Sequence, residues 1–410
     1  MKCLRSDYII TMDSGLSIIR GGCVVMDEAI VEVSTDPEET RVRYPELEVI
    51  DLGEGSVLMP GLVNPHVHLE FSGNKTTLEY GDFLPWLYSV MGNREALIEG
   101  CNDACVRKAI EGMLASGITT FGAISSYGFD LEACAEAPQR VVYFNEAIGS
   151  NPAAVDGFFL DFESRLKNSK NHASERFTPG VAIHSPYSVH PVMVRKVLDL
   201  ARSEGLPVSA HFMESPAERE WLDHSKGDFK PFFKKFLNTE HSLTGGYEFL
   251  GQFMNLSPLY THGVYINDEE LDRIESQGGT VVHCPVSNRL LGCGQLDLER
   301  LKAREIPYAI ATDGLSSNYD LNLFKEMRTA LFQQSGLDLA LLARDLLTAA
   351  TRNGSRALGL NGGSLEAGKD ADVIVLRLPD NVEEERLLPL QVVLHCSEAE
   401  SVYIKGEQVR

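Results

Sequence analysis

Histidine and aspartate residues recur in this chain directly after short apolar segments, and these residue types bind metal ions and move protons. His66 and His68 stand two positions apart at the end of the run PGLVNPHVH, residues 60–68. Positions i and i+2 of a strand face the same side, so this pair can bind one ion. Further polar residues end later apolar segments, namely His184, His211, His262 and Asp313. We expect these residues to share one site.

Three of the histidines and the aspartate form a donor set of three nitrogens and one oxygen, which suits zinc and also ferrous iron. The set consists of His66, His68, His211 and Asp313. Each histidine taken alone could be an ordinary hydrogen-bonded residue of the core or rim. Their recurrence at the ends of separate segments is harder to explain in that way. We therefore expect one divalent metal ion, zinc in preference to iron.

Glu214 follows the third histidine closely, in the segment HFME, residues 211–214. A carboxyl group in the loop just after a metal ligand can reach the substrate rather than the ion, and can then act as a proton shuttle. A surface salt bridge is the alternative. Other catalytic patterns fail: no PCxxC follows the HLE of residues 68–70 as a cytidine-type zinc deaminase requires. The chain also has no Gly-x-Ser-x-Gly elbow and no dinucleotide fingerprint.

The segments that carry these residues alternate with amphipathic stretches typical of helices, such as 103–115, 192–203, 269–277 and 321–333. Strands are expected over 61–66, 119–124, 140–145, 181–184, 207–211, 257–261, 280–284 and 308–312. Eight strands alternating with helices predict an α/β fold, a (β/α)₈ TIM barrel rather than an open doubly wound sheet. Because strand ends converge at the C-terminal rim of such a barrel, the polar residues above would meet there.

Both ends of the chain read as short strands. These are expected over 23–27, 30–33 and 47–52, and again over 371–376, 391–394 and 402–404. Neither end holds enough strands for a stable sheet of its own. We therefore predict one small β-sandwich domain built from residues 1–58 and 361–410, with a metal-dependent catalytic barrel over 59–360. Residues 212–256 exceed a plain strand–helix unit and are expected to form a lid or pocket wall.

The net charge, the apolar runs and the cysteine pattern of the chain exclude several classes of function. The formal net charge of −22 over 410 residues argues against nucleic-acid binding and against anionic membranes. No run approaches the 18 apolar residues of a membrane span, and residues 1–22 lack the apolar core of a signal peptide. The eight cysteines include no CxxC pair, so we expect free thiols in a reducing compartment. A cytoplasmic enzyme with a small-molecule substrate fits these features.

Several of these motifs together resemble the amidohydrolase superfamily, and the resemblance covers the whole chain. PGLVNPHVH (60–68) resembles its first-strand signature, and HSPYSV (184–189) resembles the fourth-strand motif of its adenosine-type and chlorohydrolase-type deaminases. THGV (261–264), CPVSN (284–288) and ATDGLSSN (311–318) resemble strands 6, 7 and 8 of that branch. GSLEAGKDAD (363–372) resembles the stretch that returns to the small β domain.

A narrower set of motifs looks like the aminofutalosine deaminases of this superfamily. These are HVHLEFS (66–72), GAIS (122–125), EW (220–221) with SKG (225–227), and SNRLL (287–291). The resemblance implies hydrolytic deamination of aminodeoxyfutalosine to futalosine and ammonia, on the route to menaquinone. His184 stands where binuclear members carry a carboxylated lysine, which implies one metal ion.

The resemblance also implies roles for individual residues. The metal would be held by the four residues named above, with Asp313 taking a proton from the attacking water and His262 polarising that water or relaying its proton. Glu214 would protonate N1 of the adenine ring, and His184 would hydrogen-bond the nucleoside. The benzoate group of that substrate calls for a cation, for which Arg94 and Arg289 are candidates alongside plain surface roles.

Other functions share the same metal ligands and stay open at this point. They are deamination of adenosine, methylthioadenosine, S-adenosylhomocysteine or guanine, and hydrolysis of a chlorinated triazine. The chain could also belong to a different functional class, as a catalytically inactive barrel that serves as a scaffold. The intact set of metal-binding residues, together with Glu214 and His262, argues against this alternative. A homodimer is the assembly we consider for the chain.

Overall fold

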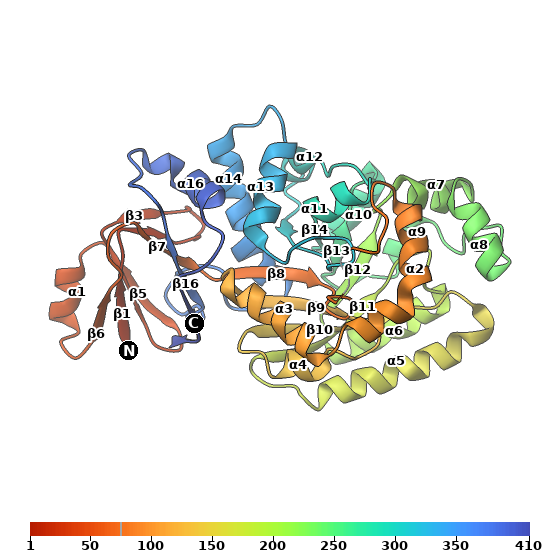
Figure 1. Cartoon of the computed structure of the whole chain (residues 1–410), viewed down its shortest axis with the longest axis horizontal. Coiled ribbons are helices and arrows are strands. Elements are labelled where there is room, and N and C mark those ends of the chain that lie inside the picture. The colour runs from red at the N-terminus through yellow and green to blue at the C-terminus, as the bar shows by residue number, and fades with distance from the viewer. Residues whose placement is uncertain (74–75) are drawn as a thin grey trace.

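Figure 1 shows a strand-and-helix barrel beside a smaller β-rich part that contains both chain ends. The computed structural model describes residues 1–73 and 76–410. In this part of the chain, no helix is both long and apolar enough to cross a membrane.

Eight parallel strands form the barrel in simple sequence order, each hydrogen-bonded to the next. They are β8 (Leu62–Val67), β9 (Ile118–Ser125), β10 (Arg140–Ala147), β11 (Phe177–Ile183), β12 (Val208–Phe212), β13 (Leu259–His262), β14 (Thr280–His283) and β15 (Tyr308–Ile310). Each of the eight predicted strands overlaps one of these, so the TIM barrel prediction is confirmed. The strands are apolar on both faces because side chains fill the barrel interior and helices cover its outside.

Helices follow most strands and begin and end at ordinary capping residues. Asn267 starts α10 with a full capping box that includes Glu270, and Gly205 ends α6 in a left-handed conformation with φ +67°. The helices of and around the barrel are α2 (Phe83–Gly100), α3 (Asp103–Ala115), α4 (Leu131–Ala135), α5 (Val155–Lys170), α6 (Pro191–Glu204), α7 (Pro216–His224), α8 (Phe229–Leu237), α9 (Gly246–Gly251), α10 (Asp268–Ser276), α11 (Pro285–Leu290), α12 (Leu298–Ala303), α13 (Leu323–Gln333), α14 (Leu339–Thr348) and α15 (Gly354–Ala357). Residues 212–256, expected as a lid or pocket wall, carry the helices α7, α8 and α9.

The first and last strands of the barrel, β8 and β15, meet without a regular hydrogen-bonded ladder. The side chain of Asn64 bridges them, because its amide nitrogen donates to Thr312 Oγ1 at 2.8 Å and its amide oxygen accepts from the Thr312 backbone nitrogen at 3.1 Å. One step further along, the Asp313 backbone nitrogen donates to the His66 carbonyl at 3.2 Å. Pro65 has no N–H, and the register of β8 against β9 shifts between Asn64 and Val67.

Two further sheets lie beside the barrel, one built from N-terminal strands alone and the other from strands of both chain ends. The first sheet has the strand order β5 (Ile30–Ser34), β4 (Cys23–Met26), β1 (Lys2–Arg5), β6 (Glu48–Asp51). The second sheet has the strand order β18 (Glu407–Gln408), β17 (Ser401–Ile404), β16 (Val373–Arg377), β7 (Ser56–Pro60), β2 (Tyr8–Ile10), β3 (Ile18–Arg20). Leu4 and Val24 of the first sheet share a buried cluster with Leu58 and Val373 of the second. The helix α1 (Pro37–Arg43) connects β5 to β6. The domain limits at 58 and 361 remain predictions.

One predicted strand is wrong. Residues 391–394 lie in the helix α16 (Leu388–His395), which starts with Pro389 in its first turn and packs on α13 and α14. A short apolar run fits a buried strand and a buried helix equally well, and here the tertiary packing selects the helix. The strands β1, β2, β3, β7 and β18 were not predicted.

A buried ion pair joins the barrel to the terminal sheets, and its removal should destabilise the protein. Arg140, the first residue of β10, bonds Asp372 at 2.6 Å and pairs with Asp370 at 3.2 Å. Its side chain is only 7% exposed. Arg140→Met leaves two carboxylates without a counter-ion, so we expect the free energy of unfolding in urea to fall by about 3 kcal/mol.

The matched control is Lys302→Met, which removes an exposed ion pair with Asp345. We expect that change to cost less than about 1 kcal/mol. Equal effects of the two substitutions would contradict a special role for the Arg140 pair.

Candidate active site

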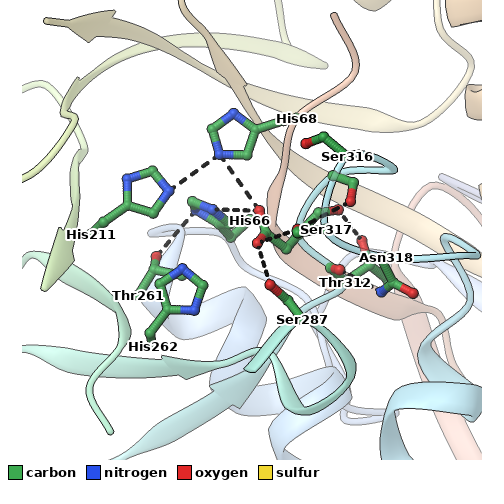
Figure 2. Close-up of polar contacts among 12 residues, drawn as sticks. His66, His68, His211, Thr261, His262, Ser287, Thr312, Ser316, Ser317 and Asn318 are labelled. Atoms are coloured by element: carbon green, nitrogen blue, oxygen red, sulfur yellow. Dashed lines mark hydrogen bonds and ion pairs between the residues drawn. The ribbon is translucent and has the colours of Figure 1, made fainter. Parts of the chain in front are cut away.

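The residues predicted to share a site converge at the C-terminal ends of the barrel strands. His66 lies in β8, His211 in β12 and His262 at the end of β13, while His68 directly follows β8 and Asp313 is the third residue after β15. Figure 2 shows the rings of His66, His68 and His211 turned toward one another. One ligand atom from each of the four predicted metal residues, the three histidines and Asp313, lies within 4.8 Å of all the others.

The distances within this cluster fit a single small cation. The Nε2 atoms of His68 and His211 are 3.2 Å apart, and Asp313 Oδ1 lies 3.5 Å from His66 Nε2 and 3.6 Å from His68 Nε2. His66 Nε2 is buried and has no hydrogen-bond partner in the described structure. A buried nitrogen without a partner is costly, and a metal ion at the centre of the cluster would satisfy it.

Hydrogen bonds on the far side of two rings orient their nitrogens. His211 Nδ1 lies 2.6 Å from the His184 carbonyl oxygen, an acceptor, so Nδ1 carries the proton and Nε2 keeps its lone pair for the cluster. His66 Nδ1 contacts Thr261 Oγ1 at 3.1 Å (Figure 2). Metal-binding histidines characteristically have such partners, which set the ring orientation.

The two oxygens of Asp313 have different surroundings. Oδ2 accepts hydrogen bonds from Ser287 at 2.8 Å and Ser317 at 2.7 Å. Oδ1 is left facing His66 and His68. Burial works to raise the pKa of Asp313, but the neighbouring rings of His66, His68 and His262 outweigh burial and hold this pKa well below 3.8. The carboxylate is therefore ionised, with one oxygen available for an ion or a water.

The imidazoles of His68, His211 and His262 are in the neutral form, which is the form that a metal ligand needs. Burial, followed by repulsion from His66, lowers the pKa of His68 to about 4. The same two causes lower the pKa of His211 well below 6.5. Burial also lowers the pKa of His262 to about 4.

Glu214 projects from a strained turn toward this cluster. The preceding residue, Met213, has the left-handed φ of +52°, which is uncommon outside glycine. Glu218 stabilises the turn, since its carboxylate accepts hydrogen bonds from the backbone nitrogens of Met213 at 3.0 Å and Glu214 at 2.8 Å. Sequence reasoning missed Glu218, although the Ser-x-x-Glu spacing from the helix cap Ser215 could have indicated it.

The surroundings of the Glu214 side chain favour its protonated form, a neutral carboxylic acid. Burial, with additional repulsion from Asp313 and Glu218, raises the pKa of Glu214 well above 4.5. Its Oε1 lies 3.6 Å from His262 Nε2. His262 Nδ1 donates to Asn288 Oδ1 at 2.9 Å, so Nε2 faces Glu214 as an acceptor. Asn288 lies in the CPVSN motif, but its contact with His262 was not predicted.

His184 stands at the edge of the cluster. Its ring centroid is 5.2 Å from that of His211, and its Nδ1 contacts Ser188 Oγ at 2.6 Å. Ligand atoms of His184, His211 and the buried Glu146 also lie within 4.8 Å of one another. Glu146 was not predicted from the sequence. Because His211 already donates from Nδ1 to a carbonyl, it has one lone pair for one ion, and this second group offers only two further ligands.

The two predicted arginines lie outside the cluster and on the surface. Arg94 is exposed on α2, with its guanidinium 4.9 Å from the centre of the Tyr127 ring. Arg289 is exposed on α11, and within the described residues its side chain has no hydrogen bond or ion pair. Their part in substrate binding remains a prediction.

The geometry of the cluster predicts how many ions the protein binds. We expect elemental analysis of zinc-loaded protein to give one zinc per chain. His211→Ala should abolish this binding, since it removes one of four ligands, whereas His184→Ala should retain one zinc.

Two zinc ions per chain in the unmodified protein would contradict this assignment. So would loss of zinc from His184→Ala, because the ion would then depend on the group of Glu146, His184 and His211.

Comparisons with known proteins agree with this geometry. The chain is 47% identical over 408 residues to an aminodeoxyfutalosine deaminase from Nitratiruptor sp., covering 100% of this chain and 99% of the relative. It is 37% identical to an adenosine deaminase from Helicobacter pylori, covering 94% of each. The structure superposes on the crystal structure of H. pylori aminofutalosine deaminase in complex with methylthio-coformycin with a TM-score of 0.95, at 34% identity and with 100% of both chains covered.

A family comparison gives the same result for nearly the whole chain. Residues 57–409 match the Amidohydrolase family, a range that includes every cluster residue described above. The chain belongs to the amidohydrolase family.

Proposed function

We propose that this protein is an aminohydrolase that converts 6-amino-6-deoxyfutalosine, an adenine nucleoside, to futalosine and ammonia, a step toward menaquinone. The observation that carries the proposal is the convergence of a three-histidine, one-aspartate cluster with an acidic Glu214 and a neutral His262. The full-length identity of 47% to an aminodeoxyfutalosine deaminase supports the choice of substrate.

The residues of the cluster fit one divalent ion, zinc in preference to iron. His66, His68, His211 and Asp313 would hold it through their Nε2 atoms and Oδ1. When bound, the ion supplies Lewis acidity, which makes a water molecule nucleophilic at neutral pH. We keep the cytoplasm and a homodimer as parts of the proposal, with a small nucleoside rather than a nucleic acid or a membrane as the partner.

Asp313 is the proposed base. Its Oδ2 is saturated by two serine hydroxyls, so only Oδ1 can take the proton of the attacking water. His262 is neutral and its Nε2 has a free lone pair, which allows it to orient that water or relay its proton.

Glu214 is the proposed acid. Its raised pKa keeps it protonated near neutral pH, so its O–H can be donated to N1 of the adenine ring as water adds to C6. The proton held by Asp313 then passes to the amino group, the C6–N bond breaks, and ammonia leaves. His184 would hydrogen-bond the nucleoside, and Arg94 or Arg289 would meet its carboxylate.

A second candidate is a deaminase of simpler adenine nucleosides, such as adenosine, methylthioadenosine or S-adenosylhomocysteine. The 37% identity to an H. pylori adenosine deaminase favours it specifically. A chlorohydrolase shares the metal ligands and has no such support. An inactive scaffold would have no need of the protonated Glu214 or of the carboxylate of Glu218 that holds its backbone.

Ultraviolet absorbance of the adenine ring tests the proposal directly. Zinc-loaded protein is incubated with aminodeoxyfutalosine, and in parallel with adenosine and methylthioadenosine. We expect rapid loss of the adenine band with the first substrate and slower change with the other two. Equal rates for all three would favour the second candidate, and no change with any of them would refute the deaminase.

Glu214→Gln tests the acid. Glutamine keeps the size of the side chain but cannot donate a carboxylic proton, so we expect kcat to fall at least about 100-fold while the zinc content stays at one per chain. The control is Glu220→Gln, an exposed position of the helix α7 that follows Glu214, which should retain full activity. Near-normal turnover in Glu214→Gln would remove this residue from the mechanism.

A further inference from the structure

A cavity of about 530 Å³ opens at the rim of the barrel, beside the catalytic cluster. It lies between the loop after β10, the residues after β11, and the helices α7 and α8. The helices α7 and α8 project from the rim of the barrel in Figure 1. None of the catalytic or metal residues lines the cavity, so the proposed chemistry does not account for it.

Aromatic rings make up much of the wall of this cavity. Trp221 and Phe233 are stacked with their ring centres 4.8 Å apart, and Tyr187 lies 6.2 Å from Phe233. Phe236 and Leu243 complete the apolar lining, and both are more than 40% exposed. Walls of this kind favour a flat, apolar ligand group that can pack against ring faces and edges.

The charged side chain at the cavity is a cation, although the chain as a whole carries a charge of −22. Lys234 and Lys235 are neighbours on α8, but only Lys235 lines the cavity. Lys234 is paired with Glu240. Lys235 has no carboxylate partner among the described residues, and its ammonium instead lies 5.0 Å from the Phe236 ring and 5.6 Å from the Tyr88 ring. An unpaired cation beside an aromatic wall is suited to an aromatic anion.

His241 adds a second polar group to the same cavity. It is exposed, and the described structure gives its side chain no hydrogen bond or ion pair. Its ring can therefore donate to an anionic ligand without losing an internal contact.

Tyr187 connects the cavity to the catalytic cluster. Its ring lines the cavity and lies 6.4 Å from the ring of His184, which is in turn 5.2 Å from the ring of His211. Burial raises the pKa of the Tyr187 hydroxyl, and the nearby carboxyl groups of Glu218 and Glu214 add to this rise. The cavity therefore begins one side chain beyond the predicted nucleoside contact.

We propose that this cavity is a subsite for an aromatic carboxylate, with Lys235 and His241 meeting the carboxylate and the aromatic wall packing on the ring. The subsite would select nucleosides that carry such a group on the side of the ribose away from the adenine. This assignment rests on the proposed function and replaces Arg94 and Arg289 as the cation for that group.

Substrate discrimination tests the subsite. The measured quantity is the ratio of kcat/KM for aminodeoxyfutalosine to kcat/KM for methylthioadenosine, which has no carboxylate. We expect Lys235→Met to lower this ratio about five-fold, mainly through KM, because it removes one partly exposed charge interaction. Leu243→Glu places a negative charge at the mouth of the cavity and should lower the ratio at least as far.

Matched controls separate the subsite from general effects. Lys234→Met changes the same residue type on the same helix outside the cavity, and the ratio should stay as in the unmodified protein. Arg94→Met tests the alternative cation. A drop with Arg94→Met and none with Lys235→Met would overturn the proposal while leaving the deaminase intact.

Binding of benzoate tests the subsite without any catalytic turnover. Saturation-transfer NMR on the zinc-loaded protein gives a dissociation constant for benzoate, which Lys235→Met should raise about five-fold and Lys234→Met should not change. An unchanged constant in Lys235→Met would mean that benzoate binds elsewhere and would overturn the proposal. Because this readout needs no substrate, a failure of the proposed deaminase reaction would be seen separately, in the absorbance assay.

Discussion

Closure of the barrel between its first and last strands is the constraint on which the site depends. β8 supplies His66 and leads into His68, and Asp313 is the third residue after β15, so the metal cluster exists only if these two strands lie side by side. Regular ladder pairing is absent at this seam, and the amide side chain of Asn64 substitutes for it through two hydrogen bonds with Thr312. An ion bound between the two strands would link them further, so metal binding and barrel closure support one another.

Burying so many titratable groups at one rim is costly, and the surrounding hydrogen bonds determine which of them carry charge. Asp313 is kept as a carboxylate by two serine hydroxyls and the facing histidines, while Glu214 has no such donors and is kept protonated by burial. The two carboxyl groups thus differ in proton affinity although both are buried. A site that uses one carboxyl group as a base and another as an acid requires this difference. The left-handed residues Met213, His262 and Asp313 show that part of the folding energy is used to aim these side chains.

The catalytic cluster and the cavity beside it lie on different elements of the molecule. The strands and the residues just after them carry the cluster. The helices α2, α7 and α8 and the loops beside them are rim elements, and they form the cavity near Tyr187 and the surface around Arg94. A barrel scaffold allows these rim elements to change without disturbing the strands.

The sequence by itself determined the barrel, the four metal-binding candidates and Glu214, because apolar runs and strand-end polar residues are local patterns that survive without knowledge of the fold. It misassigned residues 391–394, since a short apolar run is equally compatible with a strand and with the helix α16. It could not identify Glu218, Asn288 or Glu146, whose roles come from contacts rather than from spacing. From the sequence, Arg94 and Arg289 were the candidate cations for the substrate carboxylate. Lys235 could not be chosen in this way, because its position beside aromatic side chains of α7, α8 and the segment after β11 depends on how these segments pack together. Local patterns specify which residues can do chemistry, and only the tertiary structure decides which of them meet.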